Sequence, residues 1–198
     1  IPATISVRHR SLGVSLRTSH VYGTDLIDTI ESTVFEQIFE ELCNMMVLDT
    51  ACQTPCHGSR WIHSRNQQLA RRKLKTLKLD QRGLFRFGGG APTASLDKRR
   101  IPSGIANAAV ELRSHTIGGT RGQKLPFLGS KSILKRLGCV LDTVLDQAHF
   151  LELGVCNIPL FLTPNGHYAI SLDDFPESGW PTDVAIDDGF VKDAFVVQ

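Results

Sequence analysis

The chain has 198 residues, of which 41% are hydrophobic and 21% are charged, with no low-complexity block; this composition excludes a mostly disordered or fibrous protein. The net charge of +2 argues neither for nor against binding to nucleic acid. No apolar run approaches the roughly 20 residues that cross a bilayer, no signal-peptide pattern is present, and 5 irregularly spaced cysteines favour a reducing, intracellular and cytoplasmic location.

The first predicted element is an amphipathic helix in an N-terminal arm, which we place at residues 1–42. Apolar side chains recur at helical intervals from Leu26 to Phe39, and Thr24 or Asp25 can cap the N-terminus of this helix. Because the chain begins with isoleucine and ends in an apolar stretch, we expect it to be a segment of a longer polypeptide.

A short buried strand is predicted at Asn44–Leu48, and the turn after it contains Pro55, which cannot continue a ladder of strands. Helical periodicity returns over residues 59–77, a segment with many lysine and arginine residues and no acidic residue. We therefore expect a basic helix with a solvated charged face after the strand.

Short apolar segments between glycine-rich turns predict many strands in the rest of the chain. Two apolar runs around a Pro-Asn-Gly turn predict a hairpin at residues 158–172. One short helix is predicted to begin at Ser130 or Ser132 and to end at Gly138. The other predicted strands lie at residues 84–87, 98–102, 108–117, 139–143 and 147–153, and residues 125–129 form a short apolar run that ends in Gly129.

The order of these elements sets the expected domains. Many short strands with few helices indicate a mainly β domain at residues 43–172. Acidic side chains concentrate after Leu172, so we expect an acidic linker or tail at residues 173–198.

Three features of the sequence occur in a defined order. The first is a hydrophobic strand that ends in Asp-Thr-small, with the sequence MVLDTA at residues 46–51. The second is a glycine-rich hairpin, FRFGGGAPTASLDKRRIP, at residues 85–102. The third is PFLGSKSILKRLGCVLD at residues 126–142, in which two apolar residues and a glycine precede a short helix and a strand. This order resembles the retropepsins, the aspartic proteases of retroviral and LTR-retrotransposon polyproteins, and the resemblance covers residues 43–153.

The resemblance implies an acid-protease β-barrel with one short helix in its core domain and added helices before and after the catalytic strand. It assigns one catalytic aspartate to each chain, Asp49, so the active site forms only in a homodimer. The two facing carboxylates share a proton; the ionised one activates a water molecule and the protonated one donates to the scissile carbonyl. No metal and no cofactor is required. The expected substrate is a polypeptide, the chain's own polyprotein, cleaved in the cytoplasm or inside virus-like particles.

The resemblance also assigns roles around Asp49. Thr50 holds the two catalytic loops together by a hydrogen bond across the dimer axis, and Ala51 occupies a position where the family usually has glycine. If φ there were positive, alanine would cost about 1 kcal/mol or more; otherwise its methyl group costs little. The flap that closes over bound peptide corresponds to Phe87, Gly88, Gly89 and Gly90, and the structural support of the site to Phe127, Leu128 and Gly129.

The sequence VLDT occurs twice, at residues 47–50 and 140–143. The second copy follows the short helix, and the bulky Val144 comes directly after it. The resemblance gives Asp142 no catalytic role. The second catalytic aspartate is therefore expected to be Asp49 of another copy of the chain.

A zinc site is an alternative interpretation of the loop after Asp49. Cys52, Cys56, His57 and His63 are residue types that bind zinc. No second cysteine pair follows at the spacing of a zinc finger, however, and the neighbours Cys56 and His57 rarely bind one ion together. The alternative interpretation of these cysteines is buried or unused thiols.

Two further alternatives stay open. The basic helix at residues 59–77 could make a weak contact with nucleic acid through Arg65, Arg72 and Lys75, if these share one face. Alanine at position 51 leaves open a catalytically inactive dimerisation or binding domain. The glycines assigned to the flap also suit an ordinary turn.

Overall fold

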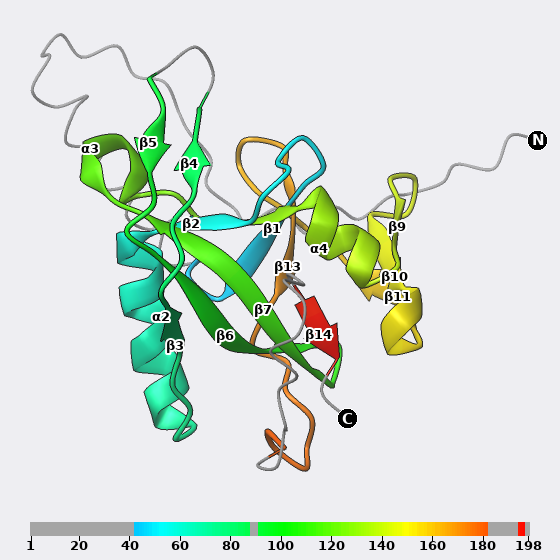
Figure 1. Ribbon diagram of the computed structural model, residues 1–198. Coiled ribbons are helices and arrows are strands. Elements are labelled where there is room, and N and C mark those ends of the chain that lie inside the picture. Colours follow the sequence, from blue (N-terminus) through cyan, green and yellow to red (C-terminus); the bar gives the residue numbers. More distant parts are fainter. Residues whose placement is uncertain (1–41, 88–90, 182–193, 197–198) are drawn as a thin grey trace, which may run out of the picture.

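A computed structural model of the protein describes residues 42–87, 91–181 and 194–196 (Figure 1). The described part is mainly β, as the sequence predicts. The helix expected between Leu26 and Phe39 lies outside the described residues.

The largest sheet has nine strands in the order β12-β13-β1-β8-β2-β7-β6-β3, and β14 pairs with β7. This path is open in the described part of the chain, so the expectation of a closed barrel is wrong. Its two end strands, β12 and β3, have only two and three residues, and each pairs on one side only. The strands are β1 (Met45–Asp49), β2 (Cys56–Gly58), β3 (Leu77–Leu79), β6 (Asp97–Ile105), β7 (Ala108–Ile117), β8 (Phe127–Ser130), β12 (Phe161–Leu162), β13 (Tyr168–Ser171) and β14 (Ala194–Val196).

Helix α2 (Ser59–Arg71) covers one face of this sheet, behind β6 and β7 in Figure 1. Trp61, Ile62 and Leu69 point from it into the core, at the spacing that the periodicity predicted. The helix ends six residues before the predicted end at residue 77. Lys73 takes a left-handed conformation with φ of 59°, and the chain then leaves to form β3.

Two shorter helices follow, and one of them was predicted. Helix α4 (Lys131–Arg136) begins after Ser130, whose hydroxyl accepts the Ile133 N–H, and it is followed by Gly138 at φ of 63°. Helix α3 (Gly119–Gly122) is a single turn.

Two small sheets complete the fold. Strands β9 (Cys139–Asp142), β10 (Gln147–Phe150) and β11 (Val155–Pro159) form one in the order β11-β10-β9, with a 3-10 turn at Leu151–Leu153. Strands β4 (Leu84–Phe85) and β5 (Thr93–Ala94) form the other. The hairpin predicted at residues 158–172 is formed in part. Strands β12 and β13 pair around its turn, but Ile158 pairs with Ala148 of β10 instead.

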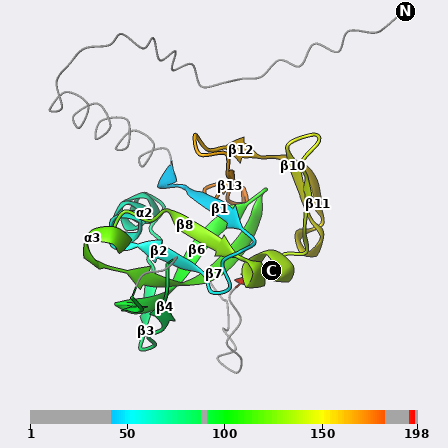
Figure 2. The ribbon, with the colours of Figure 1, turned by 90° about the horizontal axis from the view of Figure 1, so that it is seen from above.

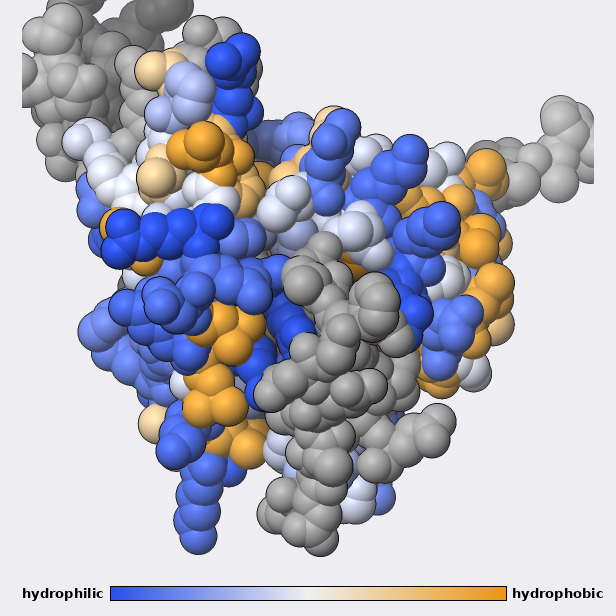
Figure 3. All heavy atoms as spheres, viewed as in Figure 1, coloured by the Kyte–Doolittle hydropathy of each residue, from blue (hydrophilic) through white to orange (hydrophobic). Residues whose placement is uncertain are grey.

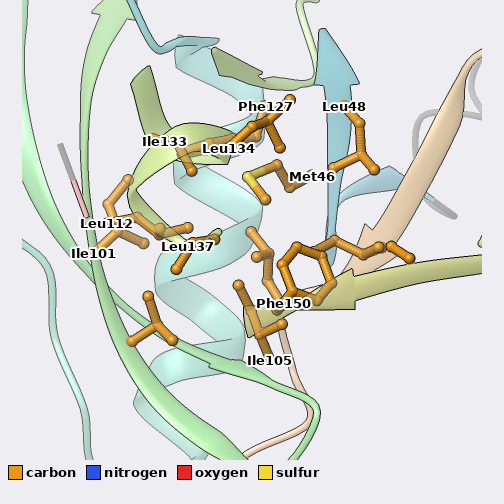
Figure 4. Close-up of a cluster of buried hydrophobic side chains, with 14 of the residues drawn as sticks. Met46, Leu48, Ile101, Ile105, Leu112, Phe127, Ile133, Leu134, Leu137 and Phe150 are labelled. Atoms are coloured by element: carbon orange, nitrogen blue, oxygen red, sulfur yellow. The ribbon is translucent and has the colours of Figure 1, made fainter. Parts of the chain in front are cut away.

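One hydrophobic core joins the sheet to α2, α4 and the β9–β11 sheet (Figure 4). Met46 and Leu48 of β1 enter it beside Phe127 of β8. The other labelled members are Ile101, Ile105, Leu112, Ile133, Leu134, Leu137 and Phe150. The end of β1 is thus held by packing on rigid neighbours.

The described residues after Leu172 also belong to this packing. The Asp174 N–H donates to the Gly104 carbonyl at 3.2 Å, and the Asp174 carbonyl accepts the Asn107 N–H at 3.1 Å. Phe175 packs against the core, and β14 pairs with β7. The part of the predicted acidic tail that the structure describes is therefore attached to the sheet.

Candidate functional site

Strand β1 lies inside the large sheet, between β8, which is parallel to it, and β13, which is antiparallel. Met46, Val47 and Leu48 are all buried, so the strand is covered on both faces. Asp49 is the last residue of the strand and pairs in register with Ser130 of β8. The sheet thus fixes the position at which Asp49 leaves it.

Strand β8 runs between β1 and β2, although β1 and β2 are consecutive in the chain. The turn at residues 50–55 therefore passes over the end of β8, where the Lys131 N–H donates to the Cys52 carbonyl at 2.9 Å. Gly129 allows β8 to lie close against β1 next to this turn. A Cβ on it would lie 2.5 Å from the Met46 sulfur and 3.2 Å from the Val47 carbonyl oxygen.

The carboxylate of Asp49 is bonded to its own turn. Its Oδ1 accepts the Ala51 N–H at 2.9 Å and the Cys52 N–H at 3.0 Å. Asp49 is half-buried, whereas Thr50 and Ala51 are exposed. The turn thus presents a fixed carboxylate and a hydroxyl at the surface.

The methyl group of Ala51 causes no backbone strain. The described non-glycine residues with positive φ are Lys73, Ala106, Asn107, Asp146 and Asn157, and Ala51 is not one of them. The penalty expected for alanine under a positive φ therefore does not arise here. Alanine therefore fits at position 51 without a positive φ.

The second VLDT copy folds in the same local way. Asp142 ends β9, and its Oδ1 accepts the Val144 and Leu145 N–H groups at 2.9 and 3.0 Å. Its surroundings differ, because β9 is the end strand of the small β11-β10-β9 sheet. The turn alone therefore does not identify a catalytic aspartate. Asp49 differs from Asp142 in ending a strand inside the large sheet.

The residues predicted as the flap, Phe87 to Gly90, lie in the chain between β4 and β5, which pair as a hairpin on the same side as the β1–β2 turn in Figure 1. Phe85 anchors its base against His115, with ring centroids 5.2 Å apart, and Phe87 stacks on Phe85 at 6.3 Å. Ser95 accepts the Gly83 N–H at 2.8 Å and closes the base. The glycines at positions 88–90 lie outside the described residues.

His57 is fully buried beneath the turn, where it is bonded through both ring nitrogens. Nδ1 lies 2.9 Å from Ser114 Oγ and Nε2 lies 3.0 Å from Thr116 Oγ1. Because the Thr116 hydroxyl donates to Asp97, it can only accept from His57, so Nε2 carries the proton and Nδ1 accepts from Ser114. No pattern in the sequence had predicted this network; its signal is the pair of polar residues at alternate positions of β7, Ser114 and Thr116.

These bonds leave His57 unsuited to zinc. His63 is exposed and bonded to Gln67 at 3.2 Å. In the part of the chain that the structure describes, no three His, Cys, Asp or Glu side chains come together as metal ligands. The zinc interpretation has no support in this geometry, and His57 has a structural role.

Burial lowers the pKa of His57 from its ordinary 6.5 to about 3, and this predicts a loss of stability in acid. At a pH below the ordinary histidine pKa of 6.5, His57 of the unfolded chain binds a proton, whereas the buried His57 of the folded chain stays neutral. This group alone should then lower the free energy of unfolding by about 1.4 kcal/mol per pH unit. Urea denaturation between about pH 7 and pH 4 measures the slope.

The exposed His63 provides the control for that experiment, since His63→Gln should leave the slope unchanged. The ring resonances of His57 should not titrate above about pH 4. Titration of His57 near the ordinary histidine value would contradict a neutral buried ring.

The basic helix does not present the expected phosphate-binding face. Arg65 is fully buried and donates to the carbonyl oxygens of Leu172 and Pro102, at 2.8 and 3.2 Å. Arg72 forms an ion pair with Asp173 at 3.1 Å. Of the three residues proposed for nucleic acid, only Lys75 is exposed without a described ion pair. The prediction that Arg65 lies on a solvated face is wrong, because helical periodicity does not distinguish a buried guanidinium from a solvated one.

Comparisons of the chain with protein-family models, with curated proteins and with solved structures gave no match. The site must therefore be interpreted from its own geometry. Within the described residues, no helix combines the length and the apolar character needed to cross a membrane.

Proposed function

We propose that the chain is an aspartic endopeptidase of the retropepsin type, in which Asp49 acts together with Asp49 of a second copy. The observation that carries the proposal is the position of Asp49. Asp49 ends β1, a buried strand of the large sheet that lies next to β8. Gly129 of β8 allows the close contact between β1 and β8. This places the carboxylate on rigid strands, as a catalytic group requires.

Three other features support the proposal. The turn after Asp49 is exposed, so it can meet a second copy. The β4–β5 hairpin has the place in the chain and the side of the sheet that a flap requires (Figure 1). Strand β8 passes directly into helix α4 behind the turn, as the Phe-Leu-Gly segment predicts.

The chemistry follows from the pairing of two carboxylates. Two close carboxylates cannot both be ionised cheaply, so the pair holds one proton between them. The ionised Asp49 takes a proton from a water molecule, which attacks the scissile carbonyl, while the protonated Asp49 donates to the carbonyl oxygen. Thr50 is next to the carboxylate and exposed, so its hydroxyl can bond across the dimer axis.

The second copy would bind to the face turned towards the viewer in Figure 2. The β4–β5 hairpin, the β1–β2 turn and the β9–β10 turn lie on this side, which is the upper side in Figure 1. Val140, Val144 and Leu145 are exposed at 47%, 89% and 63%. In Figure 3, apolar residues gather on the right flank, where Figure 1 shows the β11-β10-β9 sheet. Strand β9 is also an end strand that a second copy can extend.

A change of Val144 and Leu145 to aspartate is therefore expected to weaken dimerisation at least about 10-fold, because it places charge in a desolvated contact. Both residues are exposed in the single chain, so its folding should change little. Light scattering over a concentration series measures the dimer, and cleavage rates should fall with it. Leu77→Asp is the control, because Leu77 is an exposed apolar residue on β3, an end strand of the large sheet and not of the β11-β10-β9 sheet. An unchanged dimer in the double variant would place the contact elsewhere.

The proposal as a whole is tested by peptide cleavage. The purified chain should cleave peptides from its own flanking sequence at acidic to neutral pH, and pepstatin, a transition-state analogue for aspartic proteases, should block the reaction. The rate should fall at alkaline pH, when both carboxylates are ionised. Cleavage that is insensitive to pepstatin would contradict the assignment.

A dimerisation domain without activity is the second candidate. The observation that favours it is the turn at Asp142, which has the same hydrogen bonds as the turn at Asp49. An aspartate at a strand end can therefore be explained by the turn alone. Substitution of the two aspartates separates the candidates, as argued below.

A further inference from the structure

One cysteine, Cys52, lies within the turn that follows Asp49, and a second, Cys56, begins β2 directly after that turn. Cys52 is half-buried and Cys56 is fully buried, and both are free thiols. Cys52 packs against the small apolar cluster formed by Cys56, Phe85 and Ile117. Its thiol donates to the Thr54 carbonyl at 3.0 Å, so the sulfur is turned back towards the chain that leads to Cys56.

The two thiols differ in reactivity. Hydrogen bonding to Cys56 lowers the pKa of Cys52, against the opposing effects of burial and of the Asp49 carboxylate. The same hydrogen bond, together with burial, raises the pKa of Cys56. A partly exposed thiol with a lowered pKa, packed against a cluster that contains a buried thiol with a raised pKa, is the arrangement of an attacking and a resolving cysteine.

We propose that hydroperoxides oxidise Cys52 and Cys56 to an intrachain disulfide, and that this bond controls the turn that carries Asp49. The second half of this inference rests on the proposed function; formation of the disulfide does not. The required partner is hydrogen peroxide or an organic hydroperoxide, small enough to reach the half-buried Cys52.

The reaction balances in two steps. The Cys52 thiolate attacks one peroxide oxygen, an S–O bond forms, the O–O bond breaks, and the leaving hydroxide takes up a proton to become water. The Cys56 sulfur then attacks the Cys52 sulfenic acid, an S–S bond forms, the S–O bond breaks, and the hydroxide leaves with the Cys56 proton as water. Two thiols are oxidised, and one hydrogen peroxide is reduced to two water molecules.

The effect on the turn follows from the bonds of Cys52. Its N–H donates to Asp49 Oδ1 at 3.0 Å and to the Asp49 carbonyl at 3.3 Å, and its carbonyl accepts the Lys131 N–H at 2.9 Å. A disulfide must bring the two sulfurs to about 2.05 Å, closer than two thiols in contact. Moving Cys52 towards Cys56 therefore disturbs the bonds that orient Asp49.

The other cysteines lack this arrangement. Cys43 accepts a hydrogen bond from Gln68 at 3.1 Å, and burial raises the pKa of Cys139 to about 11. Cys156 is exposed on β11. Cys156→Ser is therefore a suitable background variant, since it removes the most exposed thiol and with it disulfides between chains.

The experiment treats the full chain, as Cys156→Ser, with hydrogen peroxide and maps disulfides by peptide mass spectrometry. A bond between Cys52 and Cys56 is expected, reversible by dithiothreitol and absent in Cys52→Ser and Cys56→Ser. Oxidation of Cys52 to a sulfinic acid with Cys56 still free to alkylate, or a bond from Cys52 to Cys43, would overturn the inference whatever the protein's activity.

Control of the turn is measured on the same samples. Oxidised protein should cleave peptide about 10- to 100-fold more slowly than reduced protein, and dithiothreitol should restore the rate in the parent but have no effect in Cys52→Ser. Equal rates in active protein would overturn this half. If the reduced protein cleaves nothing, the proposed function fails, and hydrogen exchange of the Ala51 and Cys52 backbone amides tests control of the turn instead. Faster exchange after oxidation supports this control, and unchanged exchange contradicts it.

Discussion

The change of Asp49 to asparagine should lower the rate of peptide cleavage by about 10³-fold or more, while the protein remains folded and dimeric. Asparagine has nearly the same shape, and its side-chain oxygen can still accept the Ala51 and Cys52 N–H groups. The turn should therefore persist. An amide can neither take a proton from water nor share one with a second carboxylate, so only the chemistry is lost. Initial rates on a peptide substrate, with light scattering as a check on the dimer, measure the effect.

The chain supplies a matched control for this substitution. Asp142 caps the same kind of turn through Val144 and Leu145, so Asp142→Asn makes the same chemical change in the same local geometry. It should leave the cleavage rate within about 2-fold of the parent. Equal losses in the two variants would show that the turns matter and the carboxylate does not, and full activity of Asp49→Asn would make the assignment of Asp49 wrong.

Local sequence patterns predicted most of the elements but not how the strands pair. The strand predicted at residues 108–117 is β7, and Ser130 and Gly138 marked the ends of α4, because these signals depend only on neighbouring residues. The insertion of β8 between β1 and β2 depends on contacts between distant segments. The open form of the sheet could not be predicted for the same reason, because strand periodicity does not reveal whether the two end strands pair with each other.

In the candidate site, too, the local features could be predicted from the sequence and the long-range contacts could not. The Asp-Thr-Ala turn and the close approach at Gly129 could be inferred from the order of residues. The network of His57, Ser114 and Thr116 could not, because it joins segments 57 and 59 residues apart. His57 was considered as a zinc ligand for its residue type alone, whereas its burial decides its role.

Arg65 is the clearest case in which the structure assigns a role that the sequence hid, and Arg65→Met should lower the free energy of unfolding by about 3 kcal/mol. The fully buried guanidinium bonds to the Leu172 and Pro102 carbonyls and, at 3.4 Å, to Asp173. Burial lowers its pKa to about 10, opposed by Asp173, so it remains charged at neutral pH. Methionine keeps the aliphatic volume but removes the hydrogen bonds from the charged guanidinium to the two carbonyl groups, and bonds of this kind contribute about 1.5–3 kcal/mol each. The midpoint and slope of urea denaturation measure the loss.

Two variants on the same side of the protein distinguish burial from charge. Arg71→Met removes the same charge from an exposed position of α2 and should change stability by less than about 0.5 kcal/mol. Arg72→Met breaks the partly exposed ion pair with Asp173 and its contact with Phe175, at 4.7 Å from the ring centroid, and should cost about 1 kcal/mol. Because Arg65 bonds to the residues that follow β13, its loss should also raise protease sensitivity after Leu172. Equal stability of Arg65→Met and Arg71→Met would show that the buried guanidinium does not hold this segment to the sheet.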